Sequence, residues 1–250
     1  MNKIVLFLLI ICIALTCGRA GEELTAEEIL AMRDKNMVFE TAYSEINMII
    51  TIGKRVIEKK LTSYTEGTEN SFVEFLSPAR DRGTKMLKTG KVLKIYFPSA
   101  ERVMRLSGHM LRQSMMGSDF SYEDMTETAE ELRKEYDVRL LREEIFAGAQ
   151  CYVLELESKI ENKTYFFIKI WVDKERYIGL KVEFYAKSRK LLKVLTVEDI
   201  KSFKNRYYPT KVTMEDKLRK NSKTEMIIKS IEFDILIPPG TFTERNLMRR

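Results

Sequence analysis

Apolar and polar residues alternate along most of the chain, and this period of two predicts β-strands. In the segment Ile46–Ile52, the side chains of Met48, Ile50 and Ile52 point to one side. The pattern predicts five further strands before residue 108, at Val56–Tyr64, Ser71–Leu76, Thr84–Lys88, Val92–Phe97 and Arg102–Leu106. After residue 135 it predicts seven more, at Val138–Ile145, Tyr152–Ser158, Thr164–Val172, Gly179–Ala186, Lys190–Phe203, Tyr208–Lys217 and Lys223–Phe233. Short turns separate these strands, which is typical of antiparallel meanders.

Two segments have a helical pattern instead. Thr25-Ala26-Glu27-Glu28 has the form of a capping box and predicts a helix that continues to about Asn36. One face of this helix carries Ile29, Met32 and Arg33. Thr126–Glu135 is rich in Glu, Arg, Lys and Ala and predicts a second helix directly before the second meander.

The two meanders are separated by the methionine-rich stretch Gly108–Asp124, which predicts short helices. Met110–Met116 is long enough for about two helical turns, and Gly117 then interrupts it. We expect Ser118 and Asp119 to cap a second short helix, and Ser121 with Asp124 to cap a third.

These short helices make a poor core by themselves, so we interpret the stretch as a lid over an apolar cavity. Methionine is unbranched and adaptable, which suits a surface that packs against variable partners. The lid residues expected to contact a ligand are Met110, Leu111, Met115, Met116 and Phe120, and the cavity wall is expected to include Leu93, Ile95, Phe97 and Met104. Gly108 and Gly117 are the expected hinges. The alternative is that these methionines simply fill a core.

The predicted fold is α+β, with one strongly curved antiparallel sheet, an N-terminal helix and the lid. Tyr165–Trp171 carries large apolar side chains on both faces, so the sheet has more apolar surface than a single layer needs. No low-complexity linker divides the chain. We therefore expect one domain at residues 21–250.

Residues 1–20 have the features of a secretory signal peptide. Lys3 precedes the apolar run Ile4–Leu15, and Gly18 and Ala20 supply small residues before a cleavage site at Gly21. The run is too short to span a bilayer. An exported protein is therefore expected, although Cys17 offers an alternative start as an acylated lipoprotein, and an uncleaved anchor ranks third.

Composition and charge narrow the classes of partner. The chain has 250 residues, of which 44% are hydrophobic and 32% charged, as in a globular protein. Loss of Lys3 and Arg19 with the signal peptide leaves 41 basic and 37 acidic residues, a net charge of +4. This modest, interspersed charge and the export signal argue against nucleic acid. Cleavage also leaves Cys151 as the single cysteine, which we interpret as a buried structural thiol.

The motifs of common enzymes are absent. His109 is the single histidine, so a histidine-rich metal site and the HExxH motif are excluded, and no GxSxG motif occurs. A nucleophile pair of His109 and Cys151 is disfavoured because Cys151 occupies a core strand position. Helix capping explains the acidic cluster Asp119, Glu123 and Asp124 better than acid–base catalysis does. We expect no catalytic residue, metal or cofactor, and a carboxylate hydrolase site is the third-ranked alternative.

A group of cations could ring the mouth of the cavity. Arg80 and Arg82 lie in the loop after the third strand, and Arg112 lies in the lid. Guanidinium groups suit phosphate and carboxylate partners. The alternative is that Asp81 and other nearby acids pair with these cations at the surface.

Three segments resemble the outer-membrane lipoprotein-sorting, LolA-like family. They are Phe75–Leu87 (FLSPARDRGTKML), Ile95–Ser99 (IYFPS) and Met115–Asp124 (MMGSDFSYED), and the ending Phe242–Leu247 also fits. Leu93-Lys94 departs from this branch, which often has Trp there. The resemblance implies an incomplete antiparallel barrel with a helical lid. It also implies a monomeric periplasmic carrier of acylated lipoproteins or lipids, loaded by a membrane release complex or exporter and unloaded at an outer-membrane acceptor. A binding module that senses lipid without transferring it is the alternative.

Overall fold

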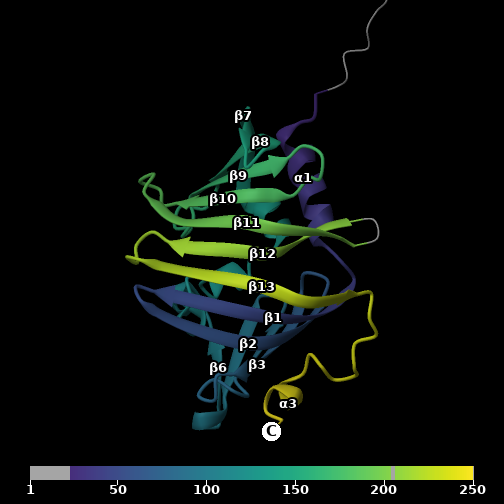
Figure 1. Ribbon diagram of the computed structural model, residues 1–250, viewed down its shortest axis with the longest axis vertical. Coiled ribbons are helices and arrows are strands. Elements are labelled where there is room, and N and C mark those ends of the chain that lie inside the picture. Colours follow the sequence, from purple (N-terminus) through teal and green to yellow (C-terminus); the bar gives the residue numbers. More distant parts are fainter. Residues whose placement is uncertain (1–22, 204–205, 250) are drawn as a thin grey trace, which may run out of the picture.

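The computed structural model describes residues 23–203 and 206–249. Within them, one sheet of thirteen strands curves into an open barrel (Figure 1). The predicted signal peptide at residues 1–20, with Cys17, lies outside the described residues. The single curved sheet with added helices confirms the α+β fold class expected from the strand pattern.

The sheet is made of two meanders. The first contains β1 (Thr41–Ile52), β2 (Arg55–Glu66), β3 (Asn70–Ser77), β4 (Lys85–Thr89), β5 (Val92–Phe97) and β6 (Arg102–Leu106). The second contains β7 (Tyr136–Phe146), β8 (Ala149–Ser158), β9 (Phe167–Asp173), β10 (Gly179–Tyr185), β11 (Leu191–Phe203), β12 (Arg206–Asp216) and β13 (Ser222–Phe233). Every pairing of neighbouring strands is antiparallel.

The two meanders join through the first and last strands of the sheet. Ala42 of β1 lies opposite Phe233 of β13, and Ile52 lies opposite Ser222. The strand order therefore runs from β6 through β1 and β13 to β7, which leaves β6 and β7 as the two free edges. Because the chain passes directly from β6 to β7, the segment between them must cross the open side of the barrel.

Double-sided burial explains why the strands of the second meander are apolar on both faces. Ile168 and Ile170 of β9 pack on the inner face with Leu154 of β8. Trp171 packs on the outer face with Cys151, whose side chain is fully buried. Cys151 is thus a structural core thiol, as expected.

The N-terminal helix α1 (Ala26–Met37) covers part of the inner face of the second meander. Its capping box is formed as predicted, because Thr25 and Glu28 exchange side-chain and backbone hydrogen bonds. Ile29 and Leu30 are buried, whereas Met32 is 38% exposed. The buried face is therefore rotated from the predicted one, since the helix packs through Leu30 in place of Met32.

The C-terminal segment leaves the sheet after β13 and returns along the outside of the first meander (Figure 1). Its short helix α3 (Glu244–Leu247) buries Leu247 against Phe72, Leu87 and Tyr96. The chain itself thus covers part of the outer face of the first meander, on β3 to β5.

The connection from β6 to β7 consists of short helical pieces. They are three 3-10 helices, η2 (Gly108–Arg112), η3 (Met115–Gly117) and η4 (Glu123–Met125), and the α-helix α2 (Ala129–Glu135). A further 3-10 turn, η1 (Pro98–Ala100), joins β5 to β6. We call residues 107–128 the lid.

The predicted helix over Met110–Met116 is wrong. The Met115 N–H donates to the carbonyl oxygen of Phe120 at 2.8 Å, and the Tyr122 N–H donates to that of Gln113 at 3.1 Å. These bonds close a tight loop over residues 114–121 and break the helix. Met116 adopts a left-handed conformation, with φ of 50°.

The predicted caps after this loop have different outcomes. Ser118 does not begin a second helix: it ends η3, and its hydroxyl donates back to the carbonyl oxygen of Met115 at 2.7 Å. Ser121 and Asp124 do cap the next turn as expected. The Ser121 N–H donates to Asp124 Oδ2 at 2.7 Å, and the Asp124 N–H donates to Ser121 Oγ at 3.4 Å.

Candidate functional site

The lid packs into the inner face of the first meander. Met115 and Phe120 are 3% and 7% exposed, and both belong to one apolar cluster with strands β1 to β6. All the apolar site residues predicted from the sequence lie in or against this cluster: Leu93, Ile95, Phe97, Met104, Met110, Leu111, Met115, Met116 and Phe120. The structure therefore brings them together, and their contact with a ligand stays a prediction.

A cavity lies beside this cluster, under the second half of the lid. Its first chamber has a volume of about 480 Å³ and is bounded by α1, the lid and the inner faces of both meanders. Its second chamber, of about 410 Å³, extends along the inner face of the second meander. Five residues line both chambers, which makes the chambers adjacent: Arg33, Met37, Phe120, Val182 and Leu195.

Only Phe120 among the predicted apolar site residues lines these chambers. The sequence analysis missed the walls contributed by the second meander. In the second chamber they are almost entirely apolar: Ile178, Val197, Val212, Met226 and Ile228. The alternation of apolar residues in β10 to β13 indicated these walls. Alternation alone, however, does not distinguish a strand face that packs against other side chains from one that lines a cavity.

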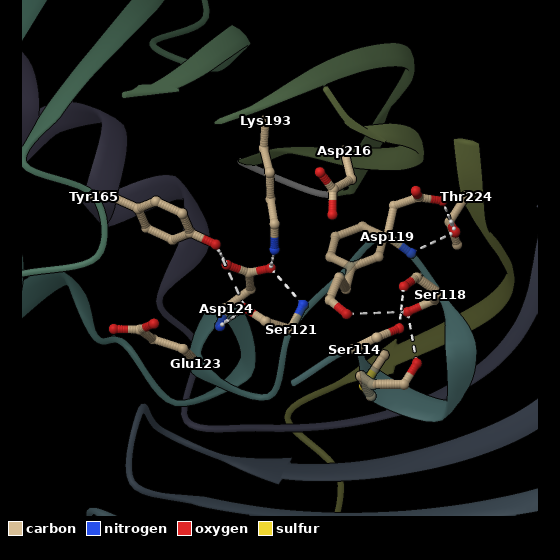
Figure 2. Close-up of polar contacts among 12 residues, drawn as sticks. Ser114, Ser118, Asp119, Ser121, Glu123, Asp124, Tyr165, Lys193, Asp216 and Thr224 are labelled. Carbon is tan, nitrogen blue, oxygen red and sulfur yellow. Dashed lines mark hydrogen bonds and ion pairs between the residues drawn. The ribbon is translucent and has the colours of Figure 1, made fainter. Parts of the chain in front are cut away.

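A buried acid fastens the lid to the second meander (Figure 2). Asp124 accepts hydrogen bonds from the Tyr165 hydroxyl at 2.6 Å and from Lys193 Nζ at 2.7 Å. Its side chain is 8% exposed and that of Lys193 is 10% exposed. Burial and the charge of Asp124 raise the pKa of Tyr165, so the phenol stays protonated and donates. We call Asp124, Tyr165 and Lys193 the Asp124 latch.

A second acid fastens the tip of the lid to β13 (Figure 2). The Thr224 hydroxyl donates to Asp119 Oδ2 at 2.6 Å, and the Asp119 N–H donates to Thr224 Oγ1 at 2.9 Å. Arg219 donates to the carbonyl oxygen of Ser118 at 2.8 Å and lies 3.6 Å from Asp119 Oδ1. The interpretation of Asp119 as a helix cap is wrong, because its carboxylate points to β13. We call this group the Asp119 latch.

Charged residues line one side of the first chamber. Arg33 and Asp34 lie on α1, Lys88 lies on β4, and Asp124 and Glu127 lie in the lid. Burial raises the pKa of Glu127, which Lys163 partly opposes from 3.1 Å. In the described part of the chain, Arg33 is the one charged residue that lines the second chamber.

The predicted rim cations do not line either chamber. The Arg80 side chain is 57% exposed and lies 3.5 Å from Asp81, whose main partner is the buried Lys59 at 2.6 Å. Arg82 Nε donates to the carbonyl oxygen of Leu76 at 3.2 Å. These arginines are thus held by the β3–β4 loop itself.

Arg112 lies apart from that loop. Its Nη2 donates to the carbonyl oxygen of Asn162, between β8 and β9, at 3.4 Å. The structure gives no contact that joins Arg112 to Arg80 or Arg82 among the described residues, so a shared rim stays a prediction.

The remaining candidates have clear positions. Gly108 and Gly117 both have positive φ, of 54° and 83°, which requires glycine-like freedom but does not test a hinge. His109 is exposed on the lid, whereas Cys151 is buried on β8, and burial raises the pKa of its thiol.

Within residues 23–203 and 206–249, no group of His, Cys, Asp or Glu side chains could hold a metal ion. The same residues contain no helix long and apolar enough to cross a membrane.

Comparison with known proteins finds a matching family model and several similar solved structures. A family model described as "-like: Uncharacterized protein" matches residues 67–249. No curated protein matches the chain. A DUF1329 family protein from Desulfovibrio piger has a similar structure, with 26% identity, a TM-score of 0.81, and coverage of 89% of this chain and 97% of that one.

Two further solved structures are described by a role or a superfamily. One, described as an outer membrane lipoprotein-sorting protein domain from Vibrio parahaemolyticus, is 25% identical with a TM-score of 0.77, over 90% of this chain and 100% of that one. The other, a LolA superfamily protein from Nitrosomonas europaea, is 26% identical with a TM-score of 0.74, over 89% and 99%. The chain therefore belongs to the family that the matching model describes, and its fold and sequence place it among the LolA-like, outer-membrane lipoprotein-sorting proteins.

Proposed function

We propose that the protein is a periplasmic carrier that holds acyl chains of lipoproteins or lipids and delivers them toward the outer membrane. The observation that carries the proposal is the two-chambered cavity bounded by α1, the lid and the inner faces of both meanders. Both volumes fall within the usual range of ligand pockets, about 300 to 1,000 Å³.

Burial of the acyl chain would drive binding. Each methylene removed from water contributes about 0.8 kcal/mol, which corresponds to about a fourfold gain in affinity. Affinity for a series of fatty acids should therefore rise with chain length until the chambers are filled. No covalent step is required, so we propose a binding protein and not an enzyme.

The sequence features that predicted export support the periplasmic location. Residues 1–20 would direct the chain out of the cytoplasm, and acylation of Cys17 would tether it to a membrane. The exposed Arg80, Arg82 and Arg112 would then be available to acidic head groups or to an acidic acceptor. Replacement of all three by Gln should flatten the salt dependence of binding to acidic vesicles.

A second function, a lipid sensor that does not release its ligand, is favoured by the two latches. Both place charged groups of the lid in largely buried contacts with the second meander, so opening requires their separation. A carrier and a sensor differ only in whether the bound lipid is delivered to an acceptor membrane. Transfer of a fluorescent fatty acid from loaded protein to acceptor vesicles separates them.

Native mass spectrometry of protein purified from its own host tests both functions. A co-purifying acyl species is expected, and a consistently empty protein would contradict both. The matched variants are Leu195→Trp and Thr196→Trp on β11. Leu195 lines both chambers, and Thr196 points to the opposite face of the sheet. Only the Leu195 variant should lose the ligand.

A further inference from the structure

The two chambers differ in chemistry. The second is walled mainly by aliphatic and aromatic side chains, with Arg33 and Thr210 as polar exceptions. The first also contains a polar side built from hydroxyls, one amide and charged groups: Ser63, Thr65, Thr68, Asn70, Ser71 and Lys88. An alkyl chain fits the second chamber, and a polar head group fits this side of the first.

The carboxylates of the first chamber already have cationic partners. Asp34 accepts from Arg33 Nε at 3.0 Å and from Arg133 Nη1 at 2.5 Å. Asp124 pairs with Lys193 in the Asp124 latch. Glu127 lies 3.1 Å from Lys163 Nζ, outside the chamber lining. Arg33 and Arg133 share the single carboxylate of Asp34, so one positive charge there is not balanced. Lys88 belongs to none of these pairs.

Arg33 is held in place with part of its guanidinium unused. Its Nε and Nη2 both donate to Asp34 Oδ1, and its Nη1 has no protein partner among the described residues. The side chain is only 15% exposed and lines both chambers.

Lys88 is the second cation with spare capacity. It is 5% exposed, and its ammonium donates to the backbone carbonyl of Thr68. No carboxylate in the described part of the chain lies within ion-pair distance of it. Burial lowers the pKa of Lys88, which Glu69 and Glu131 oppose at longer range, and an anion in the chamber would favour its charged form.

We propose that the cavity selects an anionic amphiphile, with a carboxylate or phosphate head at Arg33 and Lys88 and its alkyl chain in the second chamber. This rests on the proposed function, namely that the cavity binds acyl chains. It adds a requirement for charge that apolar burial alone does not impose.

Three probes of equal chain length test the requirement: dodecanoate, dodecyl phosphate and dodecanol. Each displaces the neutral fluorophore N-phenyl-1-naphthylamine from the full-length mature protein. At least one anionic probe should bind about tenfold to a hundredfold more tightly than dodecanol, as expected for charge-assisted hydrogen bonds in a buried site. Arg33→Gln and Lys88→Met should each reduce that ratio toward one and leave dodecanol binding intact.

Arg142→Gln is the matched control, because it removes the same charge from a half-exposed side chain on β7, outside the lining of both chambers, and should preserve the ratio. Retained dodecanol binding in each variant establishes that it folds. Equal binding of all three probes to the unmodified protein would overturn the head-group site and leave the carrier function standing. An undiminished ratio in both cavity variants would overturn the assignment to Arg33 and Lys88. Failure of every probe to displace the fluorophore would contradict the carrier function itself.

Discussion

Replacement of Asp124 by Asn should destabilise the protein through the Asp124 latch. The carboxylate accepts three hydrogen bonds, from Tyr165, Lys193 and the backbone N–H of Ser121. The amide has nearly the same shape but loses the charge, so Lys193 keeps a largely buried ammonium without a counter-charge. Removal of one partner from a buried ion pair costs about 3 to 5 kcal/mol. The slight exposure of both groups places the expected loss near the lower end, about 3 kcal/mol.

A double-mutant cycle separates this loss from general disruption. Lys193→Met alone leaves Asp124 charged and buried, with Tyr165 and Ser121 as its remaining donors. The double variant Asp124→Asn, Lys193→Met has no unpaired charge at the latch. Its loss should therefore be smaller than the sum of the two single losses by at least about 1.5 kcal/mol.

Urea unfolding followed by Trp171 fluorescence measures each corner of the cycle. Trp171 is the only tryptophan of the chain and is 5% exposed, so its emission reports on unfolding of the sheet. Glu130→Gln is the control, because its pair with Lys134 is largely exposed and its loss should leave the midpoint unchanged. Single losses that simply add, with a coupling below about 0.5 kcal/mol, would refute the latch.

Three further changes test the lid and the first chamber. Met115→Ala should lower the free energy of unfolding by about 3 kcal/mol, and Met116→Ala by less than about half as much, because Met115 is buried in the apolar cluster and Met116 is only partly buried. A large loss of acyl-chain affinity in Met115→Ala with unchanged melting would instead assign Met115 to ligand binding. Gly117→Ala should lower the free energy of unfolding by about 1 kcal/mol, because φ is 83°, and by no more, because its Cβ would meet nothing within 4 Å. Thermal melts should show a larger loss for Gly83→Ala, whose Cβ would lie 3.2 Å from a proline ring. Burial raises the folded-state pKa of Glu127 above 4.5, so the folded state holds a proton that the unfolded chain releases. This contribution to stability is lost as pH rises above roughly 4.5 toward the folded-state pKa. The urea midpoint of Glu127→Gln should lack this loss, and parallel pH profiles of the variant and the unmodified protein would contradict it.

The strand pattern was predictable because alternation is a local property. Val92–Phe97 and Arg102–Leu106 match β5 and β6 residue for residue. The pairing of β1 with β13 was not predictable in the same way, because it joins segments about 180 residues apart along the chain. That pairing sets the open side between β6 and β7, and therefore the path of the lid.

The lid itself shows where local propensity fails. Met110–Met116 has residues that favour a helix, yet the backbone bonds from Met115 to Phe120 and from Tyr122 to Gln113 close a loop instead. The surroundings of the predicted rim arginines also depend on a contact that is distant in sequence. The partner of Asp81 is Lys59, on a strand 22 residues earlier, and no local pattern places the two together.

The segments that carry the family resemblance mainly fix the frame of the barrel. In the first of them, Asp81 pairs with the buried Lys59. In Met115–Asp124, the two acids of the lid bind the second meander. The residues proposed to select the ligand, Arg33 and Lys88, lie outside both segments. On this proposal, the segments that carry the resemblance and the residues that choose the ligand are different parts of this chain, so a relative could keep the latched lid while its cavity accepts a different head group.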